Sequence, residues 1–198
     1  MSSLDAFLAN HEVHIVEGYC QQVPEQIADL KRLCSMPHVN RILEIGFNTG
    51  SSAEVFLKNS LAQIVSFDIG QHAYVPLGKE FIDSTFPGRH LLILGDSKHT
   101  VPVFAKNNPS VKFDLIFIDG GHDFDTALKD LQHCKQLAHA DTLVVMDDTQ
   151  FSLNHPFESY NIGPTLAWSL MVKNGHIEEI EHASYAPFRG QTVGKYKL

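Results

Sequence analysis

The chain has 198 residues, of which 43% are hydrophobic and 19% are charged, and its formal net charge at pH 7 is −8. A chain of this length and balance can bury most of its unfolded surface as a globular protein. The negative charge and the absence of a cluster of Lys and Arg both argue against a protein that binds nucleic acid or an anionic membrane through a basic face. No apolar run approaches the ~20 residues of a membrane span.

The sequence also bears on compartment and domain organisation. Cys20, Cys34 and Cys134 have no metal-binding spacing and cannot all pair, which is typical of reduced thiols in a cytoplasmic chain. Residues 1–18 lack the basic start and apolar core of a signal peptide, so we expect none. We expect a single domain over residues 1–198, with residues 1–36 as a helical N-terminal extension. The sequence leaves a homo-oligomer open.

Short apolar runs alternate with longer segments of helical periodicity. In chain order the pattern predicts strands over 41–46, 63–69, 91–96, 113–119 and 142–148, and helices over 24–36, 51–58, 72–86, 97–106 and 124–137. A polar loop over 149–161 then leads to a predicted helix over 164–173 and to two strands, 176–184 and 190–198, which we expect to form a hairpin near an edge. Strands that are apolar on both faces and alternate with helices indicate an α/β fold. We therefore predict a Rossmann-like, doubly wound, seven-stranded and mostly parallel sheet with a C-terminal antiparallel hairpin.

Each of the five central strands ends at or just before an acidic residue. These residues are Glu44, Asp68, Asp96, Asp119 and the pair Asp147–Asp148. The carboxyl ends of parallel strands lie at one edge of the sheet, where ligands bind in such folds. We therefore expect a site lined with carboxylates at this edge.

The turn after the first strand, EIGFNTGSSAEVF, leads directly into a helix. Gly46 and Gly50 let the backbone pass close to a ligand, and the free N–H groups near Ser52 favour a negative group. Asn48 stands where the dinucleotide pattern GxGxxG has its second glycine, which counts against an NAD-linked oxidoreductase. A ligand with a carboxylate and an ammonium group fits better, with Glu44 near the ammonium.

The next two strand ends suit a nucleoside. Asp68 lies 22 residues after Gly46, where an acid accepts hydrogen bonds from both ribose hydroxyls. Asp96 has two interpretations: it accepts a hydrogen bond from the adenine amine, or it caps the helix that begins near Ser97. Together these residues describe a nucleoside joined to an amino acid.

With these motifs, and with GDS at 95–97 and IDGGH at 118–122, the chain resembles class I S-adenosylmethionine-dependent methyltransferases from about Glu17 to its C-terminus. The stretches VEGY (16–19), EIGFNTGSSA, IDGGHDFDTALKDL and MDD are most similar to small-molecule O-methyltransferases, a group that includes macrolide-sugar methyltransferases. The resemblance implies S-adenosylmethionine as cofactor and a small-molecule acceptor with a hydroxyl, sugars included. An S-adenosylmethionine-binding module or partner subunit without catalysis is the alternative.

The resemblance also implies site residues. It puts Mg²⁺ on Asp119, Asp147 and Asp148, and it makes His122 the base, with Asp119 against the methionine part of the cofactor. Three converging carboxylates repel one another unless a cation or bound protons neutralise them, and a metal-bound hydroxyl is more acidic. The predicted cofactor site comprises Glu44, Gly46, Asn48, Gly50, Ser52, Asp68, Asp96, Ser97 and Asp119.

Several residues around these motifs have interpretations of their own. Asp123 and Asp125 lie in the first turn of a predicted helix and suit its macrodipole better than a ligand. Asp147–Asp148 have the alternative of capping the following turn, and His122 that of pointing at water. The substrate-contact candidates are Phe151, His155, Phe157 and Tyr160, and the residues expected to close over the cofactor are Glu17, Gly18 and Tyr19.

Overall fold

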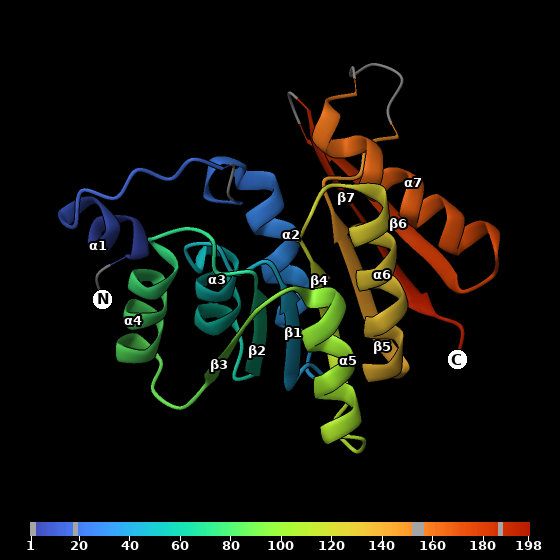
Figure 1. Cartoon of the computed structure of the whole chain (residues 1–198), viewed down its shortest axis with the longest axis horizontal. Helices are drawn as coiled ribbons and strands as arrows, with labels where there is room; N and C mark the ends of the chain where they lie inside the picture. Colours follow the sequence, from blue (N-terminus) through green and yellow to red (C-terminus); the bar gives the residue numbers. More distant parts are fainter. Residues whose placement is uncertain (1–2, 18–19, 152–156, 186–187) are drawn as a thin grey trace.

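A computed structural model of the protein describes residues 3–17, 20–151, 157–185 and 188–198. Within these ranges seven strands form one sheet in the order β3-β2-β1-β4-β5-β7-β6 (Figure 1). The strands are β1 (Arg41–Ile45), β2 (Gln63–Asp68), β3 (His90–Leu94), β4 (Phe113–Ile118), β5 (Ala138–Asp147), β6 (Ile177–Tyr185) and β7 (Arg189–Tyr196). Strands β1 to β5 pair in parallel, and β7 runs antiparallel between β5 and β6. This confirms the predicted sheet and its C-terminal hairpin.

Helices cover both faces of the sheet (Figure 1). In the described ranges they are α1 (Leu4–Asn10), α2 (Pro24–Cys34), α3 (Ser51–Asn59), α4 (Val75–Thr85), α5 (Ser97–Asn107), α6 (Phe124–Cys134) and α7 (Ser159–Lys173), with short 3₁₀ turns η1 (Cys20–Gln22) and η2 (Lys135–Leu137). One core cluster joins the sheet to α1–α4, and a second joins it to α5–α7. Helices on both faces make this a doubly wound fold.

Alternation along the strands explains the two cores. In β4, Leu115 and Phe117 belong to the cluster under α1–α4, whereas Ile116 and Ile118 belong to the cluster under α5–α7. Successive side chains of a strand point to opposite faces, so a strand covered on both sides must be apolar at every position.

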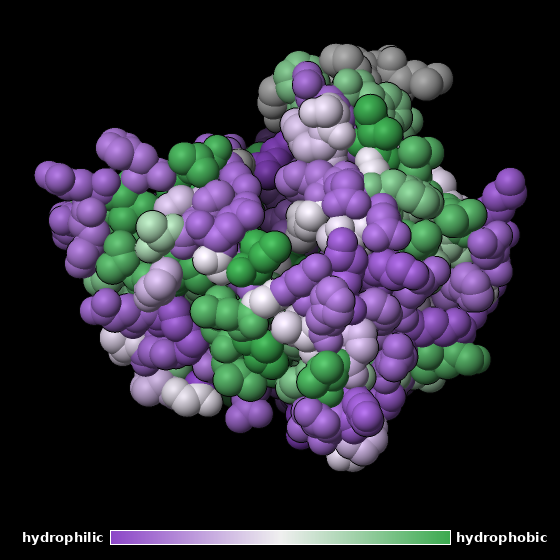
Figure 2. All heavy atoms as spheres, viewed as in Figure 1, coloured by the Kyte–Doolittle hydropathy of each residue, from purple (hydrophilic) through white to green (hydrophobic). Residues whose placement is uncertain are grey.

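Helix α7 begins at Ser159, earlier than the predicted start at 164. Glu158 and Asn161 form a reciprocal capping box at its start, so Pro164 lies inside the helix. On α7, Ile162 and Leu166 are about half exposed, and Figure 2 shows hydrophobic side chains over this helix. None of the helices in the described parts of the chain has the length and apolar character needed to cross a membrane.

Candidate active site

A cleft of about 720 Å³ opens where the parallel strands end. Its walls are the turns that follow β1, β2, β3 and β4, together with residues from the N-terminal segment, from α7 and from the start of β7. Nine of the predicted site residues line it: Gly46, Asn48, Ser52, Asp68, Asp96, Ser97, Asp119, His122 and Asp148. Glu44, Gly50 and Asp147 do not line it. The cleft therefore lies at the predicted edge, with a somewhat different set of side chains.

The turn after β1 is held by the acid at the end of β2. The Asp68 Oδ2 atom accepts hydrogen bonds from the backbone N–H groups of Phe47, at 3.0 Å, and Asn48, at 2.8 Å. Both Gly46 and Asn48 have positive φ angles, 91° and 50°. Asp68 thus fixes the shape of the turn from inside the cleft, and its contact with ribose hydroxyls stays a prediction.

Gly50 is the N-cap of α3 with φ 88°, and its N–H donates to the Phe47 carbonyl at 2.7 Å. It shapes the turn without facing the cleft. Asp96 is the N-cap of α5, where its Oδ1 accepts from the Lys98 N–H at 2.9 Å. The capping interpretation of Asp96 is therefore confirmed, while its contact with adenine stays a prediction.

The structure does not place Glu44 in the cleft. Glu44 is an interior residue of β1 that shares a face with Ile42, and its side chain is fully buried beneath α3. Its two oxygens accept hydrogen bonds of 2.5 Å from the hydroxyls of Ser52 and Ser66. Burial raises the pKa of Glu44 to about 7, although both hydroxyls act to lower it. Glu44 supports the turn from below and does not reach a ligand ammonium.

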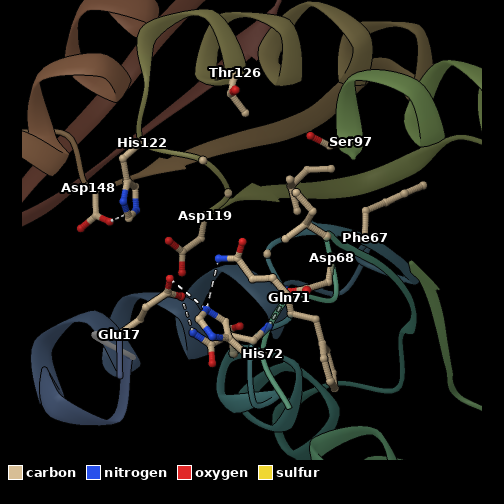
Figure 3. Close-up of a pocket in the computed structure, with 18 of the residues that line it drawn as sticks. Glu17, Phe67, Asp68, Gln71, His72, Ser97, Asp119, His122, Thr126 and Asp148 are labelled. Atoms are coloured by element: carbon tan, nitrogen blue, oxygen red, sulfur yellow. Dashed lines mark hydrogen bonds and ion pairs between the residues drawn. The ribbon is translucent and has the colours of Figure 1, made fainter. Parts of the chain in front are cut away.

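Asp119, His122 and Asp148 come together in the cleft, beyond the ends of β4 and β5 (Figure 3). One ligand atom from each lies within 4.8 Å of the others. His122 Nε2 lies 3.0 Å from Asp148 Oδ2, and this hydrogen bond raises the pKa of His122 against the effect of burial. Burial and the charges of Asp147 and Asp148 raise the pKa of Asp119.

Asp147 points away from this group. It shares the face of Val145 in β5 and is buried, with its Oδ2 accepting from Gln26 Nε2 of α2 at 2.6 Å. Its Oδ1 accepts from the backbone N–H of Asp148 at 2.8 Å. Burial, and then the charge of Asp148, raises the pKa of Asp147 to about 7. The acid pair is therefore split between α2 and the cleft.

Arg189, which is not among the predicted site residues, lies at the start of β7 and lines the cleft. Its side chain is 14% exposed, and its Nε lies 3.7 Å from Asp148 Oδ1. The predicted last strand began at 190, which left this arginine in a loop. Strand β7 runs antiparallel beside β5 and starts near the point where β5 ends, which brings Arg189 to the cleft.

The acid cluster suits Mg²⁺ poorly. Mg²⁺ prefers oxygen ligands in a near-octahedral shell. The gathered set contributes an imidazole nitrogen that already pairs with Asp148, and the third predicted ligand, Asp147, is bound to Gln26. A guanidinium group also lies beside the cluster. Binding of Mg²⁺ by Asp119, Asp147 and Asp148 stays a prediction that this geometry does not favour.

Of the acceptor candidates, Tyr160 lines the cleft, with its ring centre 6.0 Å from that of His122. Phe151 packs against His182 with ring centres 5.8 Å apart. Neither Phe151 nor Phe157 lines the cleft, and His155 lies outside the described residues. Asp123 caps α6 by accepting from the Thr126 N–H at 3.0 Å, as its predicted place in the first turn suggests.

Glu17 reaches the cleft from the N-terminal side (Figure 3). Its Oε2 accepts from Asn48 Nδ2 at 3.0 Å, and its Oε1 lies 3.0 Å from His72 Nε2. These contacts tie the N-terminal segment to the first turn. Gly18 and Tyr19, which were expected to close over the cofactor with Glu17, lie outside the described residues.

A strand-end cleft lined by carboxylates in a doubly wound fold is what the methyltransferase resemblance predicted. The sequence matches the family model of a methyltransferase domain over residues 43–149, more than half of the chain. The protein therefore belongs to this methyltransferase family. No curated protein has a significantly matching sequence.

Solved structures share the fold. An O-methyltransferase from Bacillus cereus in complex with S-adenosylhomocysteine matches with a TM-score of 0.74 and 16% identity, over 97% of this chain and 90% of its own. An O-methyltransferase of tomaymycin synthesis from Streptomyces achromogenes, in complex with S-adenosylmethionine, matches at 0.73 and 14%, over 98% and 88%. A TDP-rhamnose 3′-O-methyltransferase of calicheamicin biosynthesis matches at 0.65 and 19%, over 98% and 92%. These likenesses confirm the Rossmann-like fold.

Proposed function

We propose that the protein transfers a methyl group from S-adenosylmethionine to a hydroxyl group of a small molecule. The observation that carries the proposal is the pair formed by His122 and Asp148, at 3.0 Å, in a strand-end cleft of a methyltransferase fold. A hydroxyl must lose its proton to become a good nucleophile, and an imidazole oriented by a carboxylate is suited to take it.

The cleft fits the cofactor in size and charge. Its volume of about 720 Å³ is in the range of small-molecule sites. Asp68 and Asp96 lie where a nucleoside is expected, and Asp119 and Glu17 offer carboxylates to the positive groups of the methionine part. When bound, S-adenosylmethionine supplies an electrophilic methyl group on its sulfonium. S-adenosylhomocysteine in the Bacillus cereus structure and S-adenosylmethionine in the Streptomyces achromogenes structure support this choice.

The chain itself supplies orientation and a proton acceptor. Because Nε2 of His122 is held by Asp148, the proton of an acceptor hydroxyl goes to Nδ1, and Asp148 stabilises the imidazolium that forms. Tyr160 lies beside His122 and lines the acceptor side of the cleft. Alignment and exclusion of water supply most of what remains, because positioning is worth about 7–11 kcal/mol.

We extend the proposal to sugars as acceptors. The acceptor side offers polar groups on Tyr160, His122 and Arg189, which suit a polyhydroxylated molecule better than an apolar one. The TDP-rhamnose 3′-O-methyltransferase, which shares the fold along nearly the whole chain, supports the same class.

The test is His122→Ala, with transfer of isotopically labelled methyl followed across a panel of sugars, nucleotide sugars and phenols. We expect turnover to fall by about 10²–10⁴-fold while binding of S-adenosylhomocysteine is unchanged. The exposed His14 lies outside the cleft, so His14→Ala serves as the control. Full turnover in His122→Ala would show that His122 is not the general base. Methylation of nitrogen acceptors alone would refute the proposal that the acceptor group is a hydroxyl. A binding module would show no turnover to lose.

A further inference from the structure

Arg189 faces an acid cluster that the proposed reaction uses only in part. Asp119, Asp147 and Asp148 lie where β4 and β5 end, with Asp147 turned toward Gln26 of α2, and the charges of all three raise the pKa of Arg189. The Arg189 side chain is 14% exposed, and its Nε lies 3.7 Å from Asp148 Oδ1. That oxygen is buried and accepts no hydrogen bond from the described residues. The carboxylate oxygen that lacks a hydrogen bond from the described residues, Asp148 Oδ1, therefore lies near the positive charge of Arg189.

The backbone holds Arg189 in this place. Strand β7 runs antiparallel to β5, with Gln191 opposite Asp147, and the Thr149 N–H donates to the Gly190 carbonyl at 3.1 Å. A Cβ atom on Gly190 would lie 2.4 Å from the Thr149 carbonyl oxygen. Only glycine lets the two strands approach this closely at that point. Arg189, the residue before Gly190, is thereby anchored beside Asp148 and is no mobile surface side chain.

A guanidinium is chemically suited to this position. It keeps its charge at any physiological pH, and it is hydrated more weakly than an ammonium, so it tolerates burial beside carboxylates. Buried like charges need a counter-charge or bound protons. A divalent cation on Asp119, His122 and Asp148 would stand next to the guanidinium and be repelled by it.

We propose that Arg189 is the resident counter-charge of the acid cluster, in place of a divalent metal ion. It acts as a positioning residue: it holds Asp148 directed at Nε2 of His122. Only the catalytic consequence of this rests on the proposed function, because the electrostatic role needs neither cofactor nor acceptor.

The experiment is a titration of the purified full-length protein with Mn²⁺, an EPR-active probe for a divalent-cation site, at mildly alkaline pH. We expect no saturable site in the wild type at millimolar Mn²⁺, and we expect Arg189→Gln to gain one that Asp148→Asn in the same background removes. Arg189→Lys keeps the positive charge and should exclude Mn²⁺ as the wild type does. Arg32→Gln, which removes a surface arginine that pairs with Asp29 and Glu181, serves as the control and should gain no site.

Two results would overturn the proposal. A saturable Mn²⁺ site in the wild type that Asp148→Asn abolishes would make the acid cluster a metal site after all. A folded Arg189→Gln that gains no site would show that the guanidinium is not what excludes the cation. If Arg189→Gln fails to fold, a saturable Mn²⁺ site in the wild type would still overturn the proposal. Because the readout is metal binding, its failure is distinct from failure of the proposed methyl transfer.

Discussion

Replacing Gly46 by alanine tests the close backbone contact between the turn after β1 and the end of β4. Gly46 has φ 91°, and a Cβ atom built on it would lie 1.7 Å from the Asp119 carbonyl oxygen, where ordinary contact begins at 3.4 Å. The obstructing atom is backbone and cannot rotate away. The Asp119 N–H also donates to the Ile45 carbonyl at 2.8 Å, so the two strand ends must separate together.

Two costs add at Gly46. A left-handed backbone costs an alanine about 1–2 kcal/mol, and forcing an extra carbon into a packed position costs about 1–3 kcal/mol. The smaller conformational freedom of the unfolded alanine chain returns about 0.4–1 kcal/mol. We therefore expect Gly46→Ala to lower the free energy of unfolding by about 1–4.5 kcal/mol. A domain with a typical 5–15 kcal/mol remains folded after this loss.

Gly88 provides the matched control. It has φ 72°, but no atom lies within 4 Å of the position that its Cβ would take. Gly88→Ala therefore carries only the backbone strain and should cost about 1 kcal/mol. Urea unfolding measures both variants, with the slope m expected to stay the same, and S-adenosylhomocysteine binding should weaken in Gly46→Ala alone. Equal losses in the two variants would refute the close approach of Gly46 to Asp119.

Two further substitutions test the titrating acids. Burial raises the pKa of Glu44 from 4.5 to about 7, so the wild type loses stability as the pH rises through that interval. Glu44→Gln lacks this loss, so its free energy of unfolding should rise by up to about 3 kcal/mol relative to the wild type at the upper end of the interval. If urea unfolding gives parallel pH profiles for the two proteins, the pKa of Glu44 is not raised. Asp114 is the opposite case, because its pKa is lowered overall. Burial acts to raise this pKa, but hydrogen bonds from the Asn40 N–H, from His139 and from the Arg41 N–H lower it by more. A lowered carboxyl pKa stabilises the fold above the unfolded pKa and ceases to do so as the pH falls, so Asp114→Asn should cost about 1 kcal/mol near neutrality and nothing in strong acid. A cost that is equal at both pH values would show that the charge of Asp114 contributes nothing.

The sheet and its ligand edge could be predicted because both rest on local signals. Strands that are apolar at each position indicate burial on both faces, and parallel strands bring their carboxyl ends to one edge. Two acids miss the cleft because buried contacts hold them elsewhere: Glu44 accepts from Ser52 of α3, and Asp147 accepts from Gln26 of α2. Glu44 shares its face with Ile42, and Asp147 shares its face with Val145. Alternation alone does not distinguish them from Asp119, which has the parity of Phe117 and yet lines the cleft.

Other features depend on contacts that are distant in sequence. Arg189 reaches the cleft only because β7 returns antiparallel beside β5, and no nearby residue predicts that return. The separation of Asp147 from Asp148 depends on Gln26 in α2. The early start of α7 was a missed local signal, since Glu158 and Asn161 have capping-box spacing. Local sequence patterns thus predict the sheet and its ligand edge. The pairing of charged side chains in the cleft depends on contacts that form only when the strands and helices have packed together.

The central claim is that the strand-end cleft binds S-adenosylmethionine and its demethylated product. Isothermal titration calorimetry of the purified protein with S-adenosylhomocysteine measures this directly. We predict a saturable heat with one ligand per chain, weakened in Gly46→Ala and unchanged in Gly88→Ala. A wild-type protein that is folded by circular dichroism and yet gives no saturable heat would contradict the account.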